Sequence, residues 1–164
     1  MAGLVGVLAL QGAVSEHAAC LEALGCRAVP VRVARELRGI DALVMPGGES
    51  TTMGHLLTRD GAWEALGDAL RGGLPVLATC AGMILLASDI AGSDQPRLGI
   101  LDVTVVRNAT GRQVESFEAP VNVPALGPQA FPAVFIRAPG VTRVGPGVEV
   151  LGTLGGEPVL VRQG

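Results

Sequence analysis

The feature that most constrains the fold is an alternation of short, almost entirely apolar runs with longer amphipathic stretches in the first half of the chain. The apolar runs are residues 4–10, 26–33, 42–45 and 75–79. The amphipathic stretches are residues 15–24, 50–57, 62–70 and 83–87. The first kind is typical of strands covered on both faces, and the second of helices. Their order predicts an α/β fold, a doubly wound and mostly parallel sheet with helices on both faces.

The second half of the chain has a different pattern. Its strand-like runs are short and separated by Gly and Pro, at residues 103–107, 113–118, 133–136, 148–154 and 159–161. Such runs favour strands added at the sheet edge, including antiparallel hairpins. A length of 164 residues suits one domain, so residues 1–164 are predicted to form a single domain.

The composition excludes several classes of protein. Hydrophobic residues make up 49% of the chain and charged residues 16%, which argues against disorder. With a net charge of −3 and 2% aromatic residues, the chain lacks the basic patch and stacking side chains that bind nucleic acid. No apolar run is long enough for a membrane helix, and the N-terminus has no basic leader. The three cysteines show no metal-type spacing, so we expect a reduced, cytoplasmic protein without a metal site.

Cys80 stands where a buried strand is predicted to turn into a helix. Its neighbours at positions −2 and +2, Ala78 and Gly82, are small, as a nucleophile elbow requires. The start of the following helix favours a thiolate, and the N–H of Ala81 would face a developing oxyanion. The alternative, a buried cysteine that acts as a small hydrophobic residue, is about equally probable from this motif alone.

A second loop follows the third strand, at Pro46-Gly47-Gly48-Glu49-Ser50. In a doubly wound sheet, this carboxyl edge is where ligands bind. Two successive glycines allow a strained or flipped peptide that can supply a second oxyanion donor. The alternative is a simple turn with Ser50 as the N-cap of the next helix. A phosphate-binding loop is disfavoured because its lysine is absent.

A cysteine nucleophile also needs a base, normally a histidine. The chain has two, His17 and His55, both on predicted helices. Helical histidines are usually surface or satisfied core residues, and neither is placed by its spacing as the partner of Cys80.

Several segments, in this order, resemble one known family over essentially the whole chain. They are residues 10–13, 46–53, 79–82, 91–94, 107–108 with 111–113, 116–119 and 135–139. Together they resemble the glutaminase subunit of pyridoxal 5'-phosphate synthase, a class I, triad-type glutamine amidotransferase.

The resemblance implies a flavodoxin-like sheet on which Cys80 attacks the side-chain amide of L-glutamine. The ammonia released would pass to a separate synthase subunit that makes pyridoxal 5'-phosphate, and the family has no metal or organic cofactor of its own. The implied site residues are Gly48, Glu49, Ser50, Arg107, Ile136 and Arg137 for glutamine, Gly48 and Ala81 for the oxyanion, and Gln11 near the face that meets the synthase.

The chain departs from the family pattern in two places. The family expects a His-Pro-Glu segment, with the catalytic base and its orienting glutamate, on a strand beyond Gly164, followed by a terminal helix. The printed sequence has no counterpart, so we expect residues 1–164 alone to be inactive or nearly so. Ala78 also replaces a usual glycine, but remains small. The alternatives are a non-catalytic, glutamine-binding or regulatory subunit of the synthase, or a cysteine hydrolase or redox sensor.

Overall fold

The structure, a computed structural model, describes residues 2–111 and 116–164. The chain divides into two compact units. The first comprises Met1–Leu86 with Gln95–Ile100, and the second comprises Ala87–Asp94 with Leu101–Gly164.

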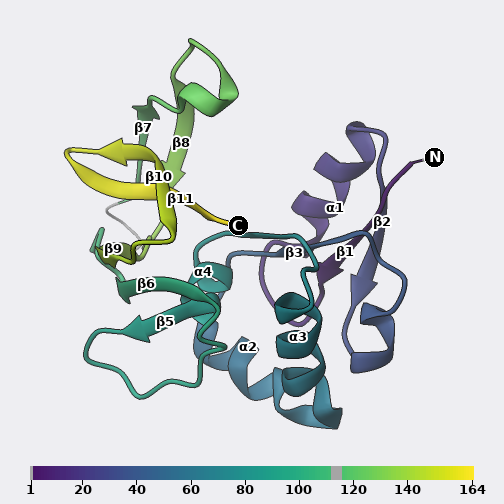
Figure 1. The fold of residues 1–164 in the computed structure, drawn as a ribbon. Coiled ribbons are helices and arrows are strands. Elements are labelled where there is room, and N and C mark those ends of the chain that lie inside the picture. Colours follow the sequence, from purple (N-terminus) through teal and green to yellow (C-terminus); the bar gives the residue numbers. More distant parts are fainter. Residues whose placement is uncertain (1, 112–115) are drawn as a thin grey trace. The chain divides into compact units, whose positions relative to one another are not determined.

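The first unit is built on a four-stranded, all-parallel sheet (Figure 1). Its strands are β1 (Leu4–Leu8), β2 (Arg27–Val31), β3 (Ala42–Met45) and β4 (Val76–Ala78), in the spatial order β2-β1-β3-β4. Its helices are α1 (Val14–Ala23), α2 (Ser50–Leu57), α3 (Ala62–Arg71) and α4 (Ala81–Leu86), with short 3-10 turns η1 (Ala34–Leu37) and η2 (Arg59–Gly61). The predicted fold class, with helices on both faces of a parallel sheet, is therefore confirmed.

The core of this unit lies on both faces of the sheet. On one face, Val5, Val7 and Val44 pack against Ala18 and Leu21 of α1. The fully buried side chains elsewhere in the unit include Leu43, Met45, Met53, Leu57, Leu66 and Leu85. Since burying one such side chain contributes about 1.5–3 kcal/mol, this apolar core is the main stabilising term of the unit.

One burial prediction is wrong. We expected the fourth strand to be buried on both faces, but Leu77 in the middle of β4 is 56% exposed. The physical reason is position: β4 is the last strand in the order β2-β1-β3-β4, and among the described strands it pairs with β3 alone.

The second unit consists of short strands that pair with one another in three small sheets. They are β5 (Ala87–Ile90), β6 (Leu101–Val106) and β9 (Gly140–Val144) in one sheet, β7 (Phe117–Val121) with β8 (Phe131–Phe135), and β10 (Val148–Leu154) with β11 (Glu157–Gln163). A 3-10 turn, η4 (Pro124–Leu126), lies between β7 and β8. All neighbours are antiparallel except β5 and β6.

One hydrophobic cluster of the second unit includes residues of β7 and β8. Val121, Val123 and Phe135 are its buried members, and the ring of Phe135 stacks on that of Phe117 at 5.0 Å. The predicted strand at 113–118 falls partly on residues 112–115, outside the described residues, and its described part begins β7 at Phe117. Strands β5 and β9 were not predicted.

No helix within residues 2–111 and 116–164 is both long enough and apolar enough to cross a membrane.

Helix α4 lies so close to β3 that one position requires glycine. A Cβ atom added to Gly82 would stand 2.8 Å from Cβ of Met45 and 3.0 Å from its carbonyl carbon. We expect Gly82→Ala to destabilise the protein by about 1–3 kcal/mol, because the β3 backbone would have to shift.

Gly54→Ala is the matched control. The added Cβ would lie 3.7 Å from the Leu85 side chain, an ordinary contact, and alanine favours the helix. Denaturant unfolding of both variants should show loss of stability in the first and none in the second. Equal stability of Gly82→Ala and wild type would contradict the close approach of α4 to β3.

Candidate active site

Cys80 occupies a sharp turn between β4 and α4. Its φ is +46°, a conformation that non-glycine residues rarely adopt and that costs on the order of 1–2 kcal/mol. Backbone hydrogen bonds hold this turn: the N–H of Thr79 donates to the carbonyl of Met45 at 3.0 Å, and that of Gly82 donates to the carbonyl of Thr79 at 2.9 Å. The strand-turn-helix geometry expected of a nucleophile elbow is thus present, and Cys80 is half-buried.

The Gly47-Gly48 loop lies beside this turn. A Cβ atom added to Gly47 would be 3.4 Å from Cβ of Cys80 and 3.7 Å from Oγ1 of Thr79. The loops that follow β3 and β4 therefore meet at the carboxyl edge of the sheet, as the sequence predicted.

The segment before α1 fixes the orientation of the Gly47-Gly48 peptide. The N–H of Ala13 donates to the Gly47 carbonyl at 3.1 Å, and Gly12, with φ +96°, touches the same carbonyl so closely that a Cβ would collide with it. The peptide is trans, so the N–H of Gly48 points the opposite way, away from Gly12 and Ala13. Gln11 also holds the loop, since its Oε1 accepts a 2.6 Å hydrogen bond from the N–H of Glu49.

Glu49, not Ser50, is the N-cap of α2. Its carboxylate accepts hydrogen bonds from the N–H groups of Thr51 at 3.3 Å and Thr52 at 2.8 Å, and from the Thr52 hydroxyl at 2.8 Å. Partial burial alone would raise the pKa of Glu49, but these bonds, led by that from the Thr52 N–H, outweigh it and hold the pKa below its usual range. The alternative reading of Ser50 as the cap is therefore wrong, because the longer Glu49 side chain reaches the free amides first.

Ser50 is buried, with 2% of its surface exposed, and its hydroxyl donates to Oε1 of Gln95 at 3.0 Å. The hydroxyl of Thr51 donates to the same oxygen at 3.2 Å. The start of α2 is thus held by Gln95, a residue that sequence reasoning missed. Its position just after Ser93-Asp94, at the end of a segment shared with the family, was the available signal.

The other predicted glutamine contacts belong to the second unit. Arg107 follows β6, and Ile136 and Arg137 follow β8. The two turns are tied together: Nε of Arg137 donates to Oδ1 of Asn108 at 3.4 Å, and the N–H of Ala138 donates to Oγ1 of Thr110 at 2.8 Å. Two residues of these turns, Asn108 and Arg137, have positive φ, at +53° and +47°. Residues 112 and 113 of the neighbouring family segment lie outside the described residues.

Of the two histidines, His55 is exposed on α2. His17 lies on α1 with its Nε2 3.4 Å from Oγ1 of Thr79, the residue directly before Cys80. From the sequence we expected a surface or satisfied core histidine, and this contact was missed because nothing in the local pattern of α1 indicates it.

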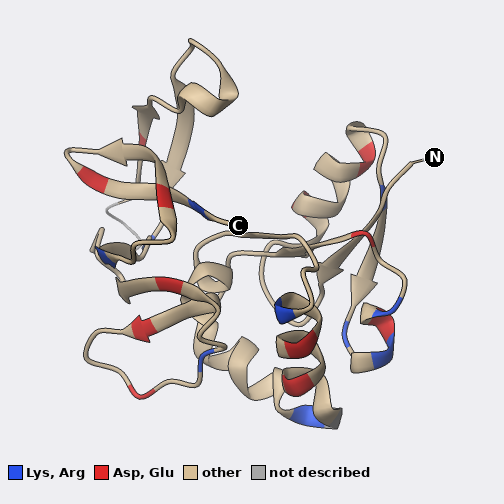
Figure 2. Ribbon diagram, in the orientation of Figure 1, with Lys and Arg blue, Asp and Glu red and all other residues tan. Residues whose placement is uncertain are grey.

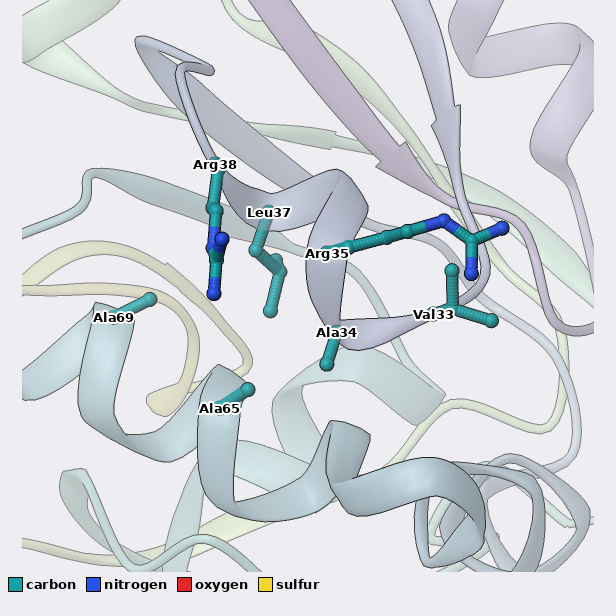
Figure 3. Close-up of a pocket in the computed structure, with 7 residues that line it drawn as sticks. All are labelled: Val33, Ala34, Arg35, Leu37, Arg38, Ala65 and Ala69. Atoms are coloured by element: carbon teal, nitrogen blue, oxygen red, sulfur yellow. The ribbon is translucent and has the colours of Figure 1, made fainter.

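A cavity of about 500 Å³ lies between η1 and α3 (Figure 3). Arg35 and Arg38 flank an apolar floor that includes Leu37, Ala65 and Ala69. Its lining contains no nucleophile and no predicted site residue, so we place the site at Cys80 and not in this cavity.

Basic and acidic residues are interspersed on η1 and α3 (Figure 2). Within the described residues, no three His, Cys, Asp or Glu side chains gather as metal ligands would.

Because the pKa of Glu49 is lowered in the folded protein, the free energy of unfolding should depend on pH. Its carboxylate is favoured by folding, so its contribution is present above the unfolded value of about 4.5 and is lost as pH falls through the lower folded value. We expect Glu49→Gln, which keeps one acceptor oxygen, to cost about 0.3–1 kcal/mol at pH 7, with the difference from wild type shrinking below pH 4.5.

The measurement is the denaturant midpoint of both proteins at neutral and acidic pH. A difference between them that is independent of pH would show that the charge of Glu49 does not stabilise the start of α2.

Comparison with known proteins agrees with this geometry. The model of the SNO glutamine amidotransferase family matches residues 7–164. The pyridoxal 5'-phosphate synthase subunit PdxT of Pelotomaculum thermopropionicum is 58% identical over 160 residues, which are 98% of this chain and 82% of that protein. PdxT of Thermus thermophilus is 55% identical over 100% of this chain and 86% of its own length.

A solved structure described as a glutamine amidotransferase is 52% identical, with a TM-score of 0.92 over 99% of this chain and 86% of its own. These similarities extend over nearly the whole chain, and they include the segments that form the Cys80 turn and the Gly47-Gly48 loop. The chain therefore belongs to the SNO glutamine amidotransferase family.

Proposed function

We propose that this chain hydrolyses L-glutamine at Cys80 and supplies the ammonia to a partner synthase that makes pyridoxal 5'-phosphate. The observation that carries the proposal is the strained Cys80 turn beside a glycine loop whose peptide orientation is fixed. The family and the names of the relatives supply the substrate class and the partner. Cys20, Cys26 and Cys80 are not joined in disulfides, which suits a cytoplasmic protein.

In the proposed reaction, the sulfur of Cys80 attacks the side-chain amide carbon of glutamine. A C–S bond forms, the carbonyl oxygen becomes an oxyanion, and the C–N bond then breaks as the nitrogen takes a proton and leaves as ammonia. Water cleaves the resulting thioester to give glutamate and restore the thiol. The N–H groups of Gly48 and Ala81 are the proposed oxyanion donors. The hydrogen bond from Ala13 to the Gly47 carbonyl supports this role for Gly48, because it sets the direction of the Gly48 N–H before substrate arrives.

Recognition of glutamine by Glu49 and Ser50 is proposed to use backbone groups other than the N–H of Glu49, which donates to Gln11. Both side chains are already engaged, that of Glu49 by the first amides of α2 and that of Ser50 by Gln95. Arg107, Ile136 and Arg137 are the proposed contacts from the second unit. The two guanidinium groups among them suit the α-carboxylate of an amino acid.

Gln11 is the proposed link to the partner. Its side chain holds the N–H of Glu49, so a synthase that contacts Gln11 would act directly on the loop that carries Gly48. This geometry supports a glutaminase whose site responds to its partner.

The base is proposed to come from the His-Pro-Glu segment of the family. His55 is exposed on α2, and His17 contacts Thr79, the residue before Cys80.

The decisive test measures ammonia release from glutamine with the synthase present. Residues 1–164 are compared with a chain extended through a His-Pro-Glu segment taken from a relative. We expect the extended chain to be active, the short chain to be slower by roughly three orders of magnitude or more, and Cys80→Ala to abolish activity in both.

Full activity of the short chain would mean that another group is the base. Synthase binding with no thioester in either chain would favour a non-catalytic, glutamine-binding subunit instead. Cys20→Ala, which alters an exposed cysteine on α1, is the matched control and should leave activity unchanged.

A further inference from the structure

We infer that His17 is a positioning residue for the nucleophile, which it holds through the hydroxyl of Thr79. The inference rests on the proposed glutaminase function and adds to it a residue outside the Cys80 and Gly47-Gly48 loops. His17 comes from α1, 62 positions before Thr79 in the chain, and its Nε2 lies 3.4 Å from Oγ1 of Thr79 in a partly buried contact.

Thr79 is the residue whose placement determines that of Cys80. Its N–H is bound to Met45 and its carbonyl to Gly82, so its backbone is fixed on both sides. Cys80 follows directly with φ +46°, and a strained conformation persists only where the surrounding contacts over-determine it. His17 adds a contact to the side chain of Thr79. It comes from α1, which is not part of the turn.

The same Thr79 hydroxyl also faces the oxyanion loop. A Cβ atom on Gly47 would be 3.7 Å from Oγ1 of Thr79, so this oxygen lies near both His17 and Gly47. The chain that carries His17 holds the loop too, through the bond from Ala13 to Gly47. One short segment, residues 11–17, therefore contacts both the loop that presents Gly48 and the turn that presents Cys80. We conclude that His17 sets the position of the thiol relative to the proposed oxyanion donors.

His17 acts on Thr79 and not on the reacting atoms, so its removal should weaken attack by the thiol without removing it. The expected loss for one hydrogen bond is about 3- to 20-fold in rate. Because the effect passes through Thr79, removing either partner should have the same effect as removing both.

The experiment follows inactivation by 6-diazo-5-oxo-L-norleucine, a glutamine-shaped diazoketone, in the complex with the synthase. The diazo carbon of the reagent takes up the thiol proton, the sulfur bonds to that carbon as dinitrogen leaves, and peptide mass mapping identifies the cysteine modified. We expect His17→Leu and Thr79→Val each to slow modification of Cys80 by about 3- to 20-fold at saturating reagent, with the half-saturating concentration unchanged. The double variant should be no slower than either single one, and Thr79→Ser, which keeps the hydroxyl, should react at the wild-type rate.

Cys20 provides the internal control, because it is exposed on the same helix as His17. Its alkylation by iodoacetamide should be equal in all variants, which shows that α1 remains folded. If His17→Leu fails this control, the comparison of Thr79→Val with Thr79→Ser still decides the outcome. Additive effects of the two substitutions, or wild-type rates in both, would overturn the inference while leaving the glutaminase proposal intact. If Cys80 of the wild type reacts no faster than Cys20, the proposed function itself fails.

Discussion

The close approach of Gly82 to the backbone of Met45 is the contact on which the rest of the site depends. It brings the first turn of α4 against the end of β3, with no room for a side chain between them. The chain must then pass from β4 into α4 within two residues, Thr79 and Cys80, and Cys80 takes up a positive φ to do so. The same approach leaves Cys80 beside Gly47, where two loops from neighbouring parallel strands meet.

The loop opposite Cys80 is held by side chains from distant parts of the chain. Gln11 fixes the N–H of Glu49 on one side, and Gln95 fixes the hydroxyl of Ser50 on the other. Glu49 itself is used to cap α2. Polar side chains that resemble ligand groups in the sequence thus fix the backbone on the C-terminal side of Gly48, whose N–H is a proposed oxyanion donor. These hydrogen bonds orient backbone groups of the loop in the absence of substrate, and such orientation favours oxyanion stabilisation.

The sequence predicted the first unit well because its strands are apolar runs bounded by Gly, Pro or charged residues. The bounds of β3 and α2 match the predicted 42–45 and 50–57. Strand β5 was missed because Ser88 and Asp89 interrupt its apolar pattern directly after the apolar run of α4. Strand β9 was missed because Thr142 and Arg143 interrupt its apolar pattern. The turn at Cys80 could be predicted from its small neighbours, whereas the contacts that His17 and Gln95 make could not, since they span 62 and 45 positions.

Backbone strain gives a reason for placing the site that does not depend on similarity to other proteins. Among the described residues, the non-glycine residues with positive φ are Cys80, Asn108 and Arg137. Cys80 is the proposed nucleophile, Arg137 a proposed glutamine contact, and Asn108 both follows Arg107 and binds the Arg137 guanidinium. Each such conformation costs free energy, and a fold retains it only where a specific side-chain direction is needed. Two of these residues were also singled out from the sequence, Cys80 by its motif and Arg137 by the family resemblance, so their strain is a separate, structural reason to test the roles proposed for them.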